Sequence, residues 1–213
     1  MFKLYRISKL FDLFRFILIY KFFKDAGIYN FLQKNIKFKY LNRIQIGSNN
    51  KFNSYSRFII EGDSINEHII IKNHNTISNF AILNAHGGYI KIGSHNFIGE
   101  RTQIQGKGGV EIGNNVLIAP NVFISSSNHD YQNPTSSDYL KSEILNKVLI
   151  NDYAWIGANC VITSGSTIGE NSIIAAGTIV TKNVRPYTMV AGNPSKEIKI
   201  YDFESQKWVK NNI

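Results

Sequence analysis

Large aliphatic residues recur every six positions in the last third of the chain, with turn-forming residues between them. They are Ile150, Ile156, Ile162, Ile168, Ile174 and Val180. A helix face recurs every three or four residues and a strand face every two, so a strict period of six indicates a solenoid. A small residue stands four positions after each of the first five, at Ala154, Cys160, Ser166, Ser172 and Thr178. Both positions are therefore expected to face a narrow interior.

Each hexad also carries a corner residue three positions after its aliphatic residue. Asn, Gly or His fills ten of the fifteen corners that can be placed, namely Asn49, His74, His86, His95, Asn115, Asn121, Asn159, Gly165, Asn171 and Gly177. These residue types tolerate the positive φ of a tight corner. Three hexads make a triangular coil, and successive coils stack at the strand spacing of about 4.8 Å. The pattern predicts an all-β solenoid, a parallel β-helix.

The period extends upstream with interruptions. It begins near Ile46, is irregular across residues 61–70, breaks at residues 106–109 and is lost after Ile124. About six coils are expected once the segment after Ile124 is set aside. That segment, near residues 125–149, is expected to leave the solenoid as an excursion loop, and long excursions from a compact domain are usually functional.

The N-terminal segment lacks the hexad and has the pattern of an amphipathic helix. The positions with helical spacing are Ile7, Leu10, Phe11, Phe14 and Leu18, with basic residues between them. A helix here would cap the open end of the solenoid or hold the protein against an anionic membrane, and the two interpretations are compatible. The expected segments are a helical cap or membrane-proximal segment (1–43), a β-helix domain (44–200) and a C-terminal tail (201–213).

The distribution of charge and the length of the apolar runs argue against a nucleic-acid-binding protein and against a membrane-spanning one. The 213 residues carry a net charge of +9, and residues 1–40 hold nine basic and two acidic residues, a net +7, so the repeats are nearly neutral. No basic groove with stacking aromatics appears there, and no nucleic-acid partner is expected. The longest uncharged apolar run, residues 16–20, is too short to span a bilayer. We expect a cytoplasmic protein, with peripheral contact to the inner face of the membrane if the N-terminal helix binds lipid.

The five histidines separate into two groups. His68, His74, His86 and His95 each stand three positions after an aliphatic residue, so corner roles are expected rather than catalysis, and no metal site is predicted. His129 lies in SSSNHDYQNP, at the root of the excursion. Imidazole titrates near neutral pH, so a histidine there is a candidate general base, with an ordinary turn histidine as the alternative. The single Cys160, at a small inward position, is expected to be structural.

The stretch IGANCVITSGSTIGENSIIAAGTIVTKNV, followed by AGNPSK, resembles the hexapeptide-repeat acyltransferases, in particular maltose, galactoside and capsular-saccharide O-acetyltransferases. The resemblance covers roughly residues 92–199. It implies a left-handed β-helix, which departs from the usual right-handed crossover. It also implies an acetyl-CoA-dependent O-acetyltransferase acting on a sugar or saccharide hydroxyl, and a homotrimer with acetyl-CoA between neighbouring prisms.

The same resemblance implies roles for single residues. The catalytic histidine of the family stands between segments that here are residues 118–122 and 153–157, which is where His129 lies. Positions matched to acetyl-CoA contacts are Trp155, Ala158, Ala176, Thr181, Lys182, Lys196 and Lys199. The last two replace family arginines, which keeps the charge but loses the bidentate fork. The family's acceptor-contacting asparagine aligns near Gly99, so the acceptor contacts are expected instead from Asn84, Arg101, Lys107 and Tyr131.

Three other functions remain open from the sequence. An amino-sugar N-acetyltransferase on this fold would use the same histidine and the same donor. A zinc carbonic anhydrase on this fold would need three clustered histidines, two of them closely spaced, and the chain has no His-x4-His pair. A noncatalytic β-helix module would bind no CoA at all.

Overall fold

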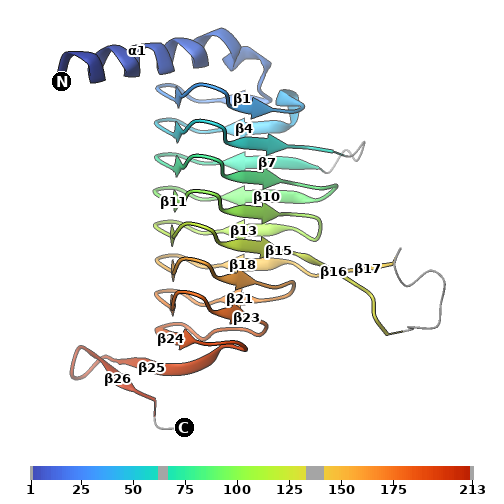
Figure 1. Ribbon diagram of the computed structural model, residues 1–213, viewed down its shortest axis with the longest axis vertical. Coiled ribbons are helices and arrows are strands. Elements are labelled where there is room, and N and C mark those ends of the chain that lie inside the picture. Colours follow the sequence, from blue (N-terminus) through green and yellow to red (C-terminus); the bar gives the residue numbers. More distant parts are fainter. Residues whose placement is uncertain (1, 62–66, 133–141, 212–213) are drawn as a thin grey trace.

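The computed structural model describes residues 2–61, 67–132 and 142–211, which form an upright prism of stacked coils (Figure 1). Each coil contains three short strands separated by corners, and equivalent strands of successive coils pair in parallel to form three flat sheets, here called A, B and C. The prism is a left-handed parallel β-helix with an N-terminal helix, as the sequence predicts.

The three sheets run the length of the prism. Sheet A contains β1 (Asp25–Ala26), β4 (Ile44–Ile46), β7 (His68–Ile71), β10 (Tyr89–Ile92), β13 (Val110–Ile112), β18 (Val148–Ile150) and β21 (Thr167–Ile168). Sheet B contains β2 (Phe31–Leu32), β5 (Lys51–Phe52), β8 (Thr76–Ile77), β11 (Phe97–Ile98), β14 (Leu117–Ile118), β19 (Trp155–Ile156), β22 (Ile173–Ile174), β24 (Thr188–Ala191), β25 (Lys196–Asp202) and β26 (Lys207–Lys210). Sheet C contains β3 (Lys37–Phe38), β6 (Arg57–Ile59), β9 (Ile82–Asn84), β12 (Gln103–Gln105), β15 (Phe123–Ser125), β20 (Val161–Ile162) and β23 (Ile179–Val180).

The hexad residues fill the interior as predicted. The six aliphatic residues from Ile150 to Val180 are fully buried, and the five small residues between them are at most 1% exposed. Strand pairing aligns equivalent hexad residues in columns, so that Ile118, Ile156 and Ile174 lie above one another in sheet B. The core is therefore a stack of layers that the sequence period specifies directly.

The corners also follow the prediction, with one exception. Corner 1 joins sheet A to B, corner 2 joins B to C and corner 3 joins C to A, and all ten predicted corner residues have positive φ. His68 was wrongly expected at a corner. It lies in β7, where its ring stacks on Tyr89 with centroids 5.5 Å apart. The coil from Ile46 to Ile71 is longer than three hexads, so counting hexads across it misplaces this residue.

The solenoid begins one coil earlier than the sequence analysis expects. β1, β2 and β3 pair in parallel with β4, β5 and β6 and form a first coil, which moves the expected boundary at residues 43/44 toward the N-terminus. Its inward hexad positions are Ala26, Leu32 and Phe38. The six-residue period is hard to recognise there in the sequence, because Ala26 is small and several lysines lie nearby. Two 3-10 turns, η1 (Tyr20–Phe22) and η2 (Leu41–Arg43), lie before and after this coil.

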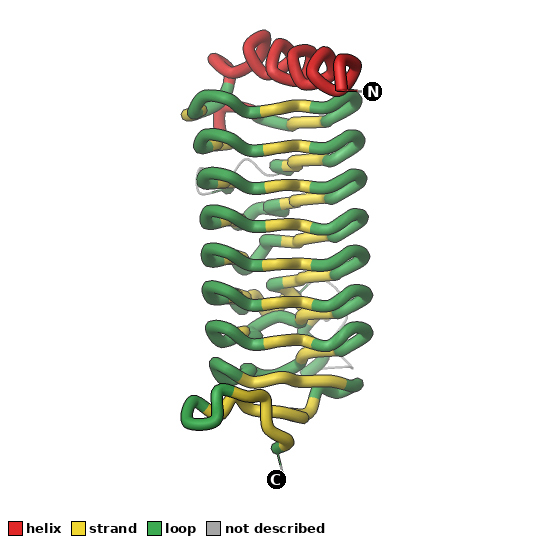
Figure 2. Tube along the Cα trace, turned by 90° about the vertical axis from the view of Figure 1, so that its left-hand side faces the viewer, coloured by secondary structure: helices red, strands yellow, loops and turns green. Residues whose placement is uncertain are grey.

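Both ends of the prism are covered. Helix α1 (Phe2–Ile19) lies across the N-terminal end (Figure 2), and its Phe16 is 3% exposed and packs on Phe23 with ring centroids 6.1 Å apart. At the other end β25 turns back antiparallel on β24 and pairs with β26. The expected tail at residues 201–213 is therefore in part a hairpin that extends sheet B, and β25 crosses the expected boundary.

Candidate active site

Every interruption of the repeat falls at corner 3. Six segments join sheet C to sheet A there: residues 39–43, 60–67, 85–88, 106–109, 126–147 and 163–166. The last is a simple corner, and the longest replaces the corner with an excursion. A coil with no interruption takes 18 residues, from Ile150 to Ile168, whereas the coil that contains the excursion takes 38, from Ile112 to Ile150. Corner 3 can therefore carry extra side chains without disturbing the stacked sheets.

The excursion begins and ends as a two-stranded arm. β16 (Ser127–His129) pairs antiparallel with β17 (Glu143–Leu145), and this β16–β17 arm projects from the prism (Figure 1). His129 lies opposite Glu143 in the ladder, and its side chain is exposed. The excursion loop near residues 125–149 is thus confirmed, with His129 on its outgoing strand.

The partner strand brings charged groups to His129. The Lys107 ammonium, from the turn after β12, contacts the carboxylate of Glu143 in a short ion pair. This bond is the main reason why the pKa of Glu143 is lowered, and the positive charges of Lys107, His129 and His86 contribute further. Lys107 is one of the expected acceptor residues. It is linked to the candidate base His129 by Glu143, which bonds to Lys107 and pairs with His129 in the ladder.

A second acid–histidine pair lies one turn further along corner 3. His86 Nδ1 is 2.7 Å from Glu61 Oε2, and the His86 N–H donates to Asn84 Oδ1 at 2.9 Å. The hydrogen bond from His86 is the largest cause of the lowered pKa of Glu61. His86 has the positive φ expected of a corner residue, 49°, yet its side chain joins a charged group that the sequence analysis did not foresee. We call Glu61, His86, Lys107, His129 and Glu143 the corner-3 polar cluster.

A buried carboxylate fixes two turns of corner 3. The Glu67 side chain has no exposed surface, and its Oε1 accepts the N–H groups of Glu61 at 2.8 Å and Gly87 at 2.9 Å. Arg43 NH1 lies 3.9 Å from Oε2 of the same carboxylate. Charged hydrogen bonds of this kind are among the stronger ones. Glu67 therefore holds the backbone that carries Glu61 against the turn that carries His86.

The remaining expected acceptor residues differ in position. Tyr131 follows the arm strand and is 67% exposed, within two residues of His129. Arg101 lies at corner 2 with φ of 57°, where its guanidinium lies over the ring of Phe80, 5.6 Å from the centroid. Asn84, Lys107 and Tyr131 are thus grouped around corner 3, and Arg101 is not.

The residues expected to contact acetyl-CoA begin at corner 2. The Gly177 N–H donates to the carbonyl of Ala158 at 2.8 Å, so the corner containing Ala176 stacks directly on the corner containing Ala158. A Cβ on Gly157 would lie 2.6 Å from the backbone N of Ala176, so only glycine permits this approach. A Cβ on Gly177 would meet no atom within 4 Å. Corner 2 therefore presents an open strip of backbone and methyl groups.

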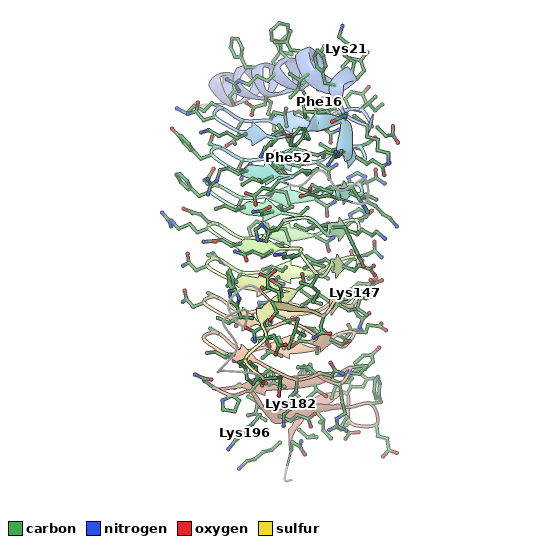
Figure 3. All side chains as sticks on the ribbon, turned by 90° about the vertical axis from the view of Figure 1, so that its right-hand side faces the viewer. Phe16, Lys21, Phe52, Lys147, Lys182 and Lys196 are labelled. Carbon is green, nitrogen blue, oxygen red and sulfur yellow. The ribbon has the colours of Figure 1, made fainter. Side chains whose placement is uncertain are left out.

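The expected phosphate-binding lysines lie on one face of β25. The register of β25 on β24 shifts, so that Lys196 pairs with Ala191 and Lys199 with Met189. Residues three apart in a regular strand point to opposite faces, but Met189 and Ala191 are two apart, so the bulge places both lysines on one face. Figure 3 shows Lys196 and Lys182 near the C-terminal end of the prism, and Thr181 and Lys182 form an exposed turn after β23.

The outer face of sheet B leads from Trp155 to Lys199. Trp155, Ile173, Met189 and Lys199 pair in succession across four strands. Beside this row lies a cavity of about 470 Å³, lined by Tyr153, Trp155, Asn171, Ile173, Tyr187, Tyr201 and Trp208. The contribution of Tyr201 and Trp208 was not foreseen, because it depends on the C-terminal hairpin folding back along sheet B.

His129 and the corner-2 strip lie at opposite ends of sheet C in one chain. The coil that leads to the arm runs from Asn121 at corner 2 to Ser126 at corner 3, five residues that span roughly 16 Å at 3.3 Å per residue. A single chain therefore does not bring His129 against Ala158 and Ala176. Among the described residues, no group of three or more His, Cys, Asp or Glu is placed to hold a metal ion.

The repeats of the β-helix match two families of hexapeptide repeats. The pattern "Bacterial transferase hexapeptide (six repeats)" matches residues 147–182, and "Hexapeptide repeat of succinyl-transferase" matches residues 89–126. These two matches in the repeat region support a hexapeptide-repeat acetyltransferase family for the chain.

Curated relatives that match part of the chain are named acetyltransferases, and a solved structure has a similar fold. The chain is 38% identical over 117 residues to a galactoside O-acetyltransferase of Escherichia coli K12, covering 54% of this chain and 56% of the relative. It is 34% identical over 99 residues to the Lactococcus lactis galactoside O-acetyltransferase, covering 44% and 46%. The chain thus spans about half the length of the curated relatives it matches. Its fold is similar to that of a mutant of AntD, an N-acyltransferase from Bacillus cereus in complex with dTDP and coenzyme A, with a TM-score of 0.64, 20% identity, and 89% and 90% of the two chains covered.

Proposed function

We propose that this protein transfers an acetyl group from acetyl-CoA to a hydroxyl of a sugar or saccharide. The observation that carries the proposal is the position of His129, on the outgoing strand of a charged arm at the one corner where the solenoid is interrupted. The hexapeptide-repeat matches and the acetyltransferase names of the curated relatives support the reaction type. The galactoside substrates named for two relatives support a saccharide acceptor.

The chemistry needs one group that takes a proton and then returns it. His129 takes the proton of the acceptor hydroxyl as its oxygen attacks the thioester carbonyl. As the tetrahedral intermediate collapses, the carbon–sulfur bond breaks and the imidazolium returns the proton to the leaving thiolate. A positioned general base of this kind contributes about 10²- to 10⁴-fold in rate. Alignment of the two substrates supplies a further part.

The donor lies along corner 2 and the C-terminal half of sheet B in this proposal. The pantetheine arm runs over Ala158 and Ala176, whose small side chains let it approach the backbone, with Trp155 beside it. Lys196 and Lys199 face the phosphates, and Thr181 and Lys182 lie near the adenine nucleotide. The shared face of the two lysines on β25 supports this assignment, because one anion can meet both charges.

The acceptor lies at corner 3 in this proposal, near His129 and its ladder partner Glu143. Carboxylates and an amide accept hydrogen bonds from sugar hydroxyls, and an ammonium donates to ring or hydroxyl oxygens. The corner-3 polar cluster and Asn84 provide these groups, and Tyr131 adds an aromatic surface two residues from the base. Arg101 lies at corner 2 of its own chain, away from the arm that carries His129, so it can contact the acceptor only from a neighbouring chain.

We also propose that the complete site forms between two chains of a homotrimer. His129 and the corner-2 strip lie at opposite ends of sheet C, and the arm projects away from its own prism. A neighbouring chain can therefore receive the arm at its own corner 2. A threefold ring of such contacts is closed, because each chain gives one arm and receives one.

Replacing His129 tests the assignment directly. His129→Ala is expected to lower the turnover of acetyl-CoA by about 10²- to 10⁴-fold and to leave CoA binding unchanged by calorimetry. His95→Asn is the matched control, since His95 is a corner residue with φ of 63° and Asn tolerates that conformation. Turnover by His129→Ala equal to that of the wild type excludes the proposed base.

The acceptor atom is tested with paired substrates. Mass spectrometry of the products formed from a sugar and from its amino counterpart distinguishes O-acetylation from N-acetylation, because both reactions would use His129 and acetyl-CoA. An O-acetyl product is expected. Acetylation of the amino sugar alone would replace this proposal with an N-acetyltransferase.

A further inference from the structure

In the part of helix α1 whose side chains the structure describes, residues 8–19, five apolar residues form an outward face. The five side chains of this outward face are each at least half exposed: Leu10 69%, Phe11 58%, Phe14 55%, Ile17 52% and Leu18 56%. Their spacing of one, three and four residues places them on one side of the helix. Exposed apolar patches of this kind usually mark an interaction surface.

The opposite side of α1 already attaches the helix to the prism. Phe16 is buried among the core residues, and the Arg15 guanidinium is 2.6 Å from Asp12 Oδ1 and 3.3 Å from the carbonyl of Leu32. Burial is the largest influence on the Asp12 carboxyl and raises its pKa. Capping of the solenoid therefore uses mainly the inward side, although Ile17 at the edge of the outward face also lines a pocket with Ala26 and Ile28 of the first coil.

The outward face forms the end of the molecule. α1 lies flat across the first coil, and the other elements extend away from it toward the C-terminus (Figure 1). Figure 3 shows Lys21 and aromatic rings pointing away from the prism at this end. A flat surface can therefore approach the helix along its length. Among the described residues, no helix is long and apolar enough to cross a membrane.

We propose that the outward face of α1 binds the surface of an anionic lipid bilayer. Residues 1–24 carry six basic and one acidic residue, a net charge of +5. Apolar side chains that enter the headgroup region and basic residues near anionic lipid act together in interfacial helices. A second copy of this chain is a poorer partner, because end-to-end contact would bring two +5 segments together.

If α1 is bound to a bilayer, the height of His129 above the bilayer limits which saccharides can reach it. This step rests on the proposed function. The arm leaves the prism between the fifth and sixth strands of sheet A, so it lies four to five strand spacings from the first coil. With about 4.8 Å per spacing and about 10 Å for the helix, His129 lies roughly 30 Å from the bilayer surface. A docked enzyme would therefore acetylate a lipid-linked saccharide several sugar units from its anchor.

Vesicle co-sedimentation of the full chain tests the contact. We expect binding to vesicles of equimolar phosphatidylcholine and phosphatidylglycerol that weakens with salt, and far weaker binding to pure phosphatidylcholine. The combined variant Phe11→Ser, Phe14→Ser should weaken binding about tenfold or more, because each phenylalanine loses its apolar burial. Lys21→Glu should weaken it several-fold. Phe203→Ser, an exposed phenylalanine near the other end, is the matched control and should bind as the wild type does.

Each result either supports or overturns the inference. Equal binding to neutral and anionic vesicles, or wild-type binding by the Phe11→Ser, Phe14→Ser variant, would overturn it. Light scattering that shows end-to-end assembly lost in this variant, without vesicle binding, would make the face an interface between copies. Acetyl transfer to a soluble saccharide should be unchanged in the variant, so failure of lipid binding and failure of the proposed reaction are separate outcomes.

Discussion

At the scale of the residue, stability depends on side chains that alternate between core and surface. Ile174 is fully buried and stacks in its column on Ile156, whereas the adjacent Ile173 lies on the outer face of sheet B and is half-buried. The interior is close-packed, and the coils above and below limit how far neighbours can move into a void. Two adjacent isoleucines in one short strand therefore have unequal contributions to folding.

The two isoleucines provide a matched pair for measurement. Ile174→Ala is expected to lower the free energy of unfolding by about 2–5 kcal/mol, because it removes buried methyl groups and leaves a cavity. Ile173→Ala should lower it by less than about 1.5 kcal/mol, because part of that side chain already contacts water. Urea unfolding followed by circular dichroism measures both. Equal losses for the two variants would contradict the assignment of inward and outward positions.

The residue scale is also where sequence reasoning works best. Corner conformation depends on the local chain, so Asn, Gly and His three positions after an aliphatic residue mark positive φ correctly at all ten positions. The register fails where an insertion of unknown length precedes a residue, as at His68. The sequence pattern also does not predict the ion pair that His86 forms with Glu61. Its backbone follows the corner rule, but its ring meets Glu61, a contact between residues 25 apart.

At the scale of the element, the β16–β17 arm is attached to the prism by an ion pair. Lys107, in a turn of the prism, bonds to Glu143 on the arm and lowers the pKa of that carboxyl. A lowered carboxyl pKa stabilises the attached state at pH above the ordinary value of 4.5. This contribution is lost as the pH falls through the lowered pKa, since the carboxyl must then bind a proton.

Titration of Glu143 followed by carboxyl NMR tests this attachment. The wild type is expected to titrate below 4.5, and Lys107→Met should move the midpoint upward because the main lowering contact is lost. Lys147→Met is the control, since Lys147 Nζ lies 3.5 Å from Glu111 Oε2 and contacts that carboxylate instead. A midpoint unchanged in Lys107→Met would show that the arm is held in another way.

The elements at the two ends were the least predictable. The first coil keeps the six-residue period at Ala26, Leu32 and Phe38, but its identity depends on parallel pairing with the next coil. The bulge that turns Lys196 and Lys199 to one face depends on the register of β25 on β24. Neither pairing is encoded in a local pattern, because each strand is selected by a partner elsewhere in the chain.

At the scale of the whole molecule, the residues that the family resemblance assigns to one active site do not meet within a single chain. Motif order placed His129 on an excursion, and the structure confirms the excursion. The order of motifs contains no information on which chain provides each part. That depends on the triangular cross-section, which separates corner 3 from corner 2 by the width of sheet C. The shared site of the homotrimer is therefore a proposal that rests on the family resemblance and on this geometry together.

Mixing two inactive variants tests the shared site. His129→Ala removes the base and keeps corner 2, whereas Ala176→Trp blocks corner 2 and keeps the base. Ala176 is exposed, so the larger side chain should not disturb the core. Each variant alone is expected to be nearly inactive. If the site lies between chains, a mixed trimer contains a complete site wherever His129 of the Ala176→Trp chain meets corner 2 of the His129→Ala chain.

Random co-assembly of the two variants makes the expected recovery quantitative. In every closed trimer that contains both variants, one of the three interfaces pairs an intact histidine with an intact corner 2, so about one third of the sites are complete after purification through both tags. Co-expression of differently tagged variants, tandem purification and an acetyl-transfer assay measure this recovery. A site within one chain predicts no recovery, because every chain then lacks one of its two parts. Mixed trimers without activity would therefore exclude the shared site. The role of His129 as the base would still be decided by the turnover of His129→Ala alone.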